Sequence, residues 1–171
     1  YPAEFMAALI TSEKNDVERV GYLIGECKNM GLEVLAPDIN ESYHGFTVIP
    51  KSNKIRFGLA AVKNVGENLV NEVVSQRKTG GKFRDIFDFM ERINPKVINR
   101  KSLEALIKAG VFDAMAERNT LLANVEKLLE IGRENEKSKS NGQQGLFAAL
   151  PAAKINGYSL SSARPAGKAE K

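Results

Sequence analysis

The spacing of apolar residues predicts a mainly helical protein. Over most of the first 137 residues, apolar side chains recur every three or four positions, which is typical of amphipathic α-helices. Pro2 suits the first turn of a helix, and Phe5, Ala8 and Leu9 share the face that we expect to be buried. Later helices are expected at about 16–31, 59–78, 84–92, 99–110 and 119–137.

Polar residues and glycines mark the ends of these predicted helices. Asp16 and Asn99 are suitable N-caps, because their side chains can accept hydrogen bonds from the first helical turn. Gly31, Gly110 and the pair Gly80-Gly81 can end helices, since glycine adopts the left-handed backbone conformation without a steric cost.

The apolar period changes between residues 33 and 57. Three short apolar runs lie here, and Pro37-Asp38 and the stretch 50–53 separate them as turn formers. We therefore predict a small β element that contains a hairpin of 46–49 with 54–57.

The apolar pattern ends after Lys137. Residues 138–171 are rich in Ser, Gly, Ala, Pro and Lys, and such a composition predicts a disordered C-terminal tail. The sequence contains neither 18 uninterrupted apolar residues nor a signal-peptide pattern, so we expect no membrane span and a cytoplasmic location. Because the chain begins with Tyr1, we expect it to be cut from a longer protein.

Positive charge is concentrated in one part of the chain. Residues 51–108 carry 13 Lys and Arg against 6 Asp and Glu, whereas residues 1–50 carry 3 against 8. A local net charge of +7 attracts polyanions and favours nucleic acid as a partner.

The basic region surrounds a tight turn between two predicted helical runs. The turn at Asn64–Gly66 resembles the helix-hairpin-helix pattern, in which unpaired amides at a helix start bind one DNA phosphate. Asn64 tolerates a positive φ, and Gly66 leaves room for the phosphate. The predicted DNA-binding residues are Lys63, Asn64, Val65, Gly66, Glu67, Asn68, Arg77, Lys78 and Lys82.

Two features of this pattern leave alternatives open. Glu67 complements the helix dipole but would compete with a phosphate, and an ordinary helix-to-helix turn would also use a glycine. A second, weaker copy of the pattern lies at 106–113, where a helix ended by Gly110 is the simpler interpretation. The predicted fold is a helical bundle with tandem helix-hairpin-helix motifs and a small β-hairpin.

Several long stretches resemble the alpha subunits of bacterial DNA polymerase III. The resemblance covers about residues 1–147, and it departs from the family's usual Gly-Val-Gly turn at Asn64. The stretches that carry it are YPAEFMAALIT (1–11), VLAPDIN (34–40), KIRFGLAAVKNVGE (54–67), GGKFRDIFDFMERI (80–93) and LEALIKAGVFDAM (103–115).

This resemblance implies a division of the chain into three parts. Residues 1–53 would form the end of the fingers region, 54–137 a helix-hairpin-helix domain that holds duplex DNA, and 138–171 the tail. The implied parent is a DNA-directed DNA polymerase with magnesium at palm carboxylates upstream of this chain. We therefore expect no catalytic residue, metal site or cofactor here, and no activity from this chain alone.

Possible catalytic groups within the chain have simpler explanations. Asp85 and Asp88 share a helix face without a third ligand and are suited to capping a helix start. His44 is isolated, and the single Cys27 lies at helical spacing with apolar residues, which indicates a buried thiol.

The predicted tail contains the segment QQGLF at 143–147. An exposed Leu-Phe pair in a disordered segment indicates a partner's pocket, although it could also fold back on the preceding helix. Gln-x-x-Leu-Phe resembles the motif by which this polymerase family binds its sliding clamp. The resemblance assigns a rim hydrogen bond to Gln143 and buried side chains to Leu146 and Phe147.

The combined prediction is the DNA-binding and clamp-tethering part of a replicative polymerase, with duplex DNA, the clamp and the rest of the holoenzyme as partners. A helix-hairpin-helix module of a repair or recombination protein is the alternative. A purely structural spacer between domains is a third.

Overall fold

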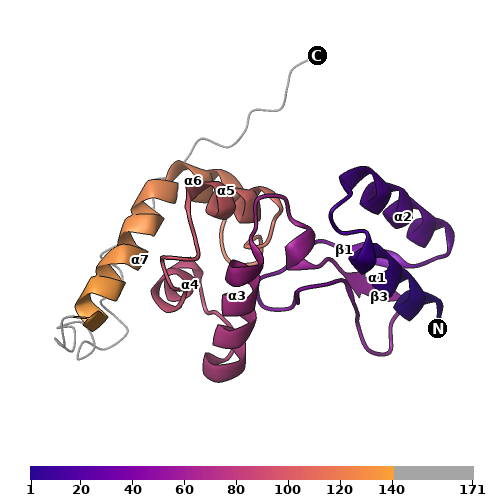
Figure 1. Ribbon diagram of the computed structural model, residues 1–171, viewed down its shortest axis with the longest axis horizontal. Helices are drawn as coiled ribbons and strands as arrows, with labels where there is room; N and C mark the ends of the chain where they lie inside the picture. The colour runs from indigo at the N-terminus through magenta and orange to yellow at the C-terminus, as the bar shows by residue number, and fades with distance from the viewer. Residues whose placement is uncertain (141–171) are drawn as a thin grey trace, which may run out of the picture.

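The computed structural model describes residues 1–140, which form two neighbouring units (Figure 1). Two helices and a small sheet make up the first unit, and α3 leads into the second, which is entirely helical. The predicted mainly helical class with a small β element is confirmed. The elements are α1 (Pro2–Ser12), α2 (Val17–Asn29), β1 (Glu33–Leu35), β2 (Thr47–Val48), β3 (Lys54–Arg56), η1 (Leu59–Ala61), α3 (Glu67–Gly80), α4 (Ile86–Arg92), α5 (Arg100–Lys108), α6 (Arg118–Ala123) and α7 (Val125–Ser140).

The first unit packs α1 and α2 against a three-stranded sheet. The strand order is β1-β3-β2, with β3 antiparallel to β2 and parallel to β1, so the predicted hairpin is confirmed and gains a third strand. Thr11 Oγ1 accepts a hydrogen bond of 2.9 Å from the Phe46 amide and thereby joins α1 to the start of the hairpin. The core of this unit consists of Ala3, Met6, Ala7, Ile10, Val20, Leu23, Cys27, Leu32, Phe46 and Ile55.

The predicted buried face of α1 is wrong. Phe5 is 64% exposed, Ala8 is also exposed and Leu9 is half-buried, whereas the neighbouring face of the same helix enters the core. Both faces have apolar residues at helical spacing, and the small side chains of Ala3 and Ala7 allow the closer approach to the sheet.

The second unit surrounds a separate core. Helices α3 to α7 contribute most of it, and Phe89 lies at its centre with its ring 5.2 Å from Phe83 and 5.0 Å from Phe112, both edge to face. Ile39 joins this core although it precedes the hairpin in the sequence, and its amide bonds to the Val111 carbonyl at 3.0 Å. The chain therefore crosses between the units more than once.

Most of the predicted helix ends are confirmed. Asp16 and Asn99 accept hydrogen bonds from the amides three residues later, and Ser102 completes a capping box with Asn99. Gly31 and Gly110 have φ of 75° and 84°, as expected for left-handed helix ends. The last predicted helix is divided at Asn124 into α6 and α7, and α7 continues to Ser140 beyond the predicted end at 137.

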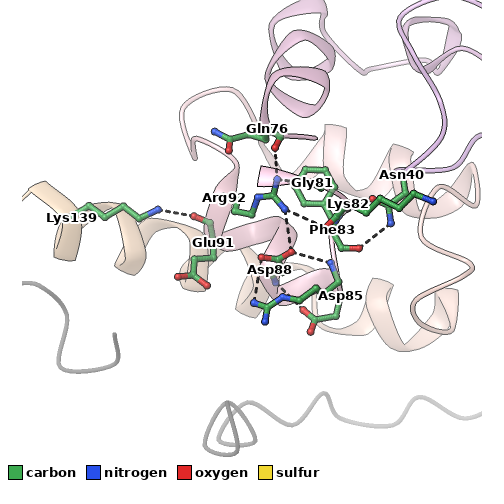
Figure 2. A network of polar contacts seen from close by, with 11 residues as sticks. Asn40, Gln76, Gly81, Lys82, Phe83, Asp85, Asp88, Glu91, Arg92 and Lys139 are labelled. Atoms are coloured by element: carbon green, nitrogen blue, oxygen red, sulfur yellow. Dashed lines mark hydrogen bonds and ion pairs between the residues drawn. The ribbon is translucent and has the colours of Figure 1, made fainter. Parts of the chain in front are cut away.

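A network around Arg92 joins the end of α3 to α4 (Figure 2). The guanidinium donates to the Gln76 carbonyl and, at 3.0 Å, to the Gly81 carbonyl, and it lies 4.4 Å over the Phe83 ring. Asp88 is buried and pairs with Arg92 at 3.3 Å, and Asp85 caps α4 by accepting from the Asp88 amide at 2.8 Å. These two carboxylates have the structural roles that the sequence predicted.

Candidate nucleic-acid interface

The turn before α3 is tight, as the sequence predicted, but the element that precedes it is shorter than expected. Instead of an α-helix from Leu59, the chain forms the single 3-10 turn η1, and Val62 returns to extended backbone. Gly58, which precedes this turn, approaches Gly45 closely, and a Cβ on Gly58 would lie 2.5 Å from the Gly45 carbonyl carbon.

Asn64 has the left-handed conformation that its residue type allows. Its φ is 67°, and the next amide, that of Val65, donates to the Val62 carbonyl at 3.2 Å. The Val65 side chain packs against the core of the second unit. The tight reversal therefore depends on an asparagine in a position where most residues would be strained.

The start of α3 is open. Gly66 is the N-cap residue, its φ of −76° needs no glycine, and a Cβ placed there would meet no atom within 4 Å. Amides of a first helical turn have no partner inside the helix, and here they lie beside the exposed side chains of Lys63 and Asn68. The geometry leaves room for an anion at this helix start.

Glu67 is held by residues that the sequence did not connect with this site. Lys14 Nζ donates to its carboxylate at 3.1 Å, and His44 Nε2 lies 3.5 Å from the same oxygen. The hydrogen bond and charge of Lys14, and then the charge of His44, lower the pKa of Glu67. Lys14 follows α1 and His44 precedes the hairpin, so no sequence spacing could place them here.

The three cations predicted beyond the turn have different surroundings. Arg77 donates to the carbonyls of Ile39 at 2.8 Å and Ser42 at 2.6 Å, so it joins α3 to the loop before the hairpin, and burial lowers its pKa. Lys78 and Lys82 are exposed near the opposite end of α3 from Gly66. The predicted residues therefore form a cluster at 63–68 and separate cations at the far end of the helix.

The second predicted turn is occupied by the chain's own side chains. No α-helix begins at Val111, because residues 110–115 form turns and α6 starts only at Arg118. Arg118 grips the carboxylate of Asp113 with Nε at 2.7 Å and Nη2 at 2.5 Å and also donates to the Lys108 carbonyl at 3.3 Å.

Other predicted sites can be placed only in part. Gln143, Leu146 and Phe147 lie outside the described residues. Within residues 1–140, no three His, Cys, Asp or Glu side chains lie close enough together to hold a metal ion. No helix in this part of the chain is long and apolar enough to cross a membrane, and Cys27 is a buried free thiol whose pKa burial raises.

Comparison with known proteins finds relatives among bacterial DNA polymerases. The chain is 42% identical over 148 residues to DNA polymerase III subunit alpha of Thermus aquaticus. It is 43% identical over 148 residues to the protein of the same name from Neisseria meningitidis, and 41% identical over 151 residues to that of Borreliella burgdorferi. These alignments cover 86–88% of the chain but only 12–13% of each relative.

A family model described as the helix-hairpin-helix motif matches residues 31–121. The matched region contains both candidate turns, all of α3 and the sheet strands that precede it. Because the match extends over more than half of the 171 residues, the chain belongs to the helix-hairpin-helix motif family.

Proposed function

We propose that this chain is the DNA-gripping and clamp-tethering part of a replicative DNA polymerase alpha subunit. The observation that carries the proposal is the open start of α3, where no side chain caps the helix, no atom lies within 4 Å of a Cβ on Gly66, and Lys63 is exposed. One DNA phosphate fits the charge and the donors of this site.

The grip is independent of base sequence. The cluster at 63–68 offers backbone amides at one helix start, which bind phosphate oxygens and carry no sequence information. Net charge of +7 over residues 51–108 adds a sequence-independent attraction that depends on salt. Arg77 supports the interface from within by fixing α3, and Lys78 and Lys82 extend the positive surface.

The chemistry of polymerisation belongs to other parts of the parent protein. The chain spans about an eighth of the relatives' length, and we assign no catalytic residue to it. Magnesium would act at palm carboxylates elsewhere in the subunit. We accordingly expect a cytoplasmic holoenzyme component that is inactive alone.

Clamp tethering rests on the sequence of residues 143–147. Leu146 and Phe147 would enter an apolar pocket of the sliding clamp while Gln143 bonds at its rim. Burial of the two apolar side chains contributes about 1.5–3 kcal/mol each, but ordering five residues opposes binding at about 1–2 kcal/mol each, so we expect the isolated motif to bind only weakly.

Duplex binding is tested by fluorescence anisotropy of labelled DNA at several salt concentrations. Two or three phosphate contacts give a shallow salt dependence, because each contributes about 0.9 to the slope. Gly66→Val should lower the affinity by about tenfold, since its branched side chain would stand between the amides and the phosphate. Gly21→Val, at another exposed glycine with no atom near its Cβ, is the matched control.

Three outcomes of this experiment would contradict the DNA-binding proposal. They are no binding at low salt, a strong preference for one sequence, or a folded Gly66→Val variant with the parent's affinity. Absence of binding would favour a structural spacer between domains.

Clamp tethering is tested by calorimetry against purified clamp. Replacement of both Leu146 and Phe147 by Ala should abolish binding without loss of helical content or DNA affinity. Unchanged clamp affinity would refute the assignment. A chain that binds DNA but no clamp would support the alternative of a repair or recombination module.

A further inference from the structure

An open pocket lies beside α3, next to the proposed phosphate site. Its volume is about 380 Å³, and one wall is the exposed face of α3 with Asn71, Ser75 and Lys78. The opposite wall is the loop that carries Tyr43 and His44. Of the residues that line this pocket, only Lys78 belongs to the predicted DNA-binding set.

Tyr43 forms a rigid aromatic platform in this pocket. Its side chain is exposed, with 50% of its surface accessible, and the guanidinium of Arg77 lies 4.9 Å from the ring centroid. Arg77 donates hydrogen bonds to the carbonyls of Ile39 and Ser42, so its guanidinium is held in place against the Tyr43 ring.

The backbone of the loop is equally fixed. The carbonyls of Tyr43 and His44 accept hydrogen bonds of 2.9 and 3.1 Å from Leu59 and Ala60 of η1. Ser42 Oγ donates to the Phe57 carbonyl at 2.7 Å. A platform held in this way loses little conformational freedom when a ligand binds, which favours affinity.

The pocket adjoins the start of α3 without a gap. His44 lines it and also lies 3.5 Å from Glu67, and Asn71 is one helical turn beyond Glu67 on the same helix. Lys78, near the C-terminal end of α3, lines the side of the pocket farther from Gly66. A DNA strand whose phosphate is bound at Gly66 can therefore continue past Tyr43 towards a second cation.

We propose that Tyr43 stacks an unpaired base of a DNA strand that continues from the Gly66 phosphate site, with Lys78 contacting a phosphate further along that strand. An exposed aromatic ring combined with a basic groove is the chemistry that binds single-stranded nucleic acid without reading its sequence. The inference rests on the proposed duplex binding for the position of the strand. It adds a preference for duplex DNA with a single-stranded extension.

The experiment compares a blunt duplex with the same duplex carrying a short single-stranded extension, using the whole chain. Because stacking one base is worth about 1–3 kcal/mol, the parent should bind the extended duplex about tenfold more tightly. Tyr43→Ala should abolish that advantage and leave blunt-duplex affinity unchanged, whereas Tyr43→Phe should retain it.

Tyr22→Ala is a matched control within the same unit. Tyr22 is 59% exposed and has Arg19 at 5.4 Å from its ring, but it lies on α2 and does not line this pocket. Its removal should not change the preference for the extension.

A second measurement needs no variant. Extensions that contain 5-iododeoxyuridine should cross-link to Tyr43, which is the only tyrosine of the tryptic peptide 29–51. The inference is overturned if the parent shows no preference for the extension, if a folded Tyr43→Ala variant keeps it, or if the cross-link falls outside that peptide.

The same data separate the two proposals. If blunt duplex binds but the extension adds nothing, only the Tyr43 site is refuted. If the extension binds through Tyr43 while blunt duplex does not bind, the duplex grip and the path of the strand from Gly66 are refuted, and only base stacking on Tyr43 stands. Absence of binding to both DNAs refutes both.

Discussion

The two candidate turns have similar sequences, but the first is open to solvent and the second is filled by side chains. At Val65-Gly66 the turn opens onto a helix start with free space around the glycine, whereas Gly110 is buried beneath Arg118 and Asp113. A Cβ on Gly110 would lie 2.4 Å from Arg118 Nη2, but one on Gly66 would meet nothing within 4 Å.

The difference shows what an apolar-glycine pattern alone can specify. Both turns need a left-handed residue, supplied by Asn64 in the first and by Gly110 in the second. Only the first continues directly into a long helix, because α3 starts at Glu67 while α6 starts eight residues after Gly110. Helix amides become available to a phosphate only where the next helix begins at once.

The largest expected effect is a difference in protein stability between valine substitutions at the two glycines. Gly110→Val should lower the free energy of unfolding by about 2–4 kcal/mol, because φ of 84° is strained for a branched residue and Arg118 must move. Gly66→Val should cost no more than about 1 kcal/mol, since its φ is ordinary and its surroundings are open. Urea unfolding of both variants measures the difference.

Equal losses in the two variants would contradict this comparison. Gly31→Val is a useful control, because Gly31 has φ of 75° and no atom near its Cβ. The free energy of unfolding that Gly31→Val loses measures backbone strain without the crowding present at Gly110.

Much of the local structure at these turns could be predicted from residue type. The caps Asp16 and Asn99, the left-handed Gly31 and Gly110 and the turn at Asn64 each follow from a short-range preference of one residue. Such preferences depend on neighbours in sequence, which is why they could be predicted without the fold.

Contacts between distant segments could not be predicted. Lys14 and Glu67 are 53 positions apart, and no periodicity relates the two. The choice between two apolar faces of α1 depends on how closely Ala3 and Ala7 approach the sheet. Such features are determined by tertiary packing and not by local sequence preference.

A smaller expected effect concerns the acidic residue at each turn. Glu67→Gln should raise duplex affinity by about twofold to fivefold at low salt, because it removes a negative charge from the proposed phosphate site. The matched variant Glu117→Gln removes a carboxylate that caps α6 beside the closed turn and should change affinity less than twofold. Anisotropy with one duplex compares both, and a larger gain from Glu117→Gln would mean that the second turn binds DNA.

The smallest expected effect is the pH dependence of the two carboxylates that form ion pairs at these turns. Lys14 and then His44 lower the pKa of Glu67, and Arg118 lowers the pKa of Asp113. A folded-state pKa below the unfolded value of about 4 gives stability that is present above the unfolded value and is lost as pH falls through the folded value.

Glu67→Gln and Asp113→Asn should therefore destabilise the chain slightly at pH 7 and make no difference near pH 2, where the parent's carboxylates are protonated. Asp113 should give the larger loss, because Arg118 binds both of its oxygens whereas Lys14 and His44 share one oxygen of the more exposed Glu67. Urea unfolding at pH 7, 5 and 2 tests this, with Glu4→Gln as the control at another exposed first-turn carboxylate. A loss at Asp113 that persists at low pH would show that its side chain packs rather than pairs, and the closed state of the second turn would then have a steric cause instead of an electrostatic one.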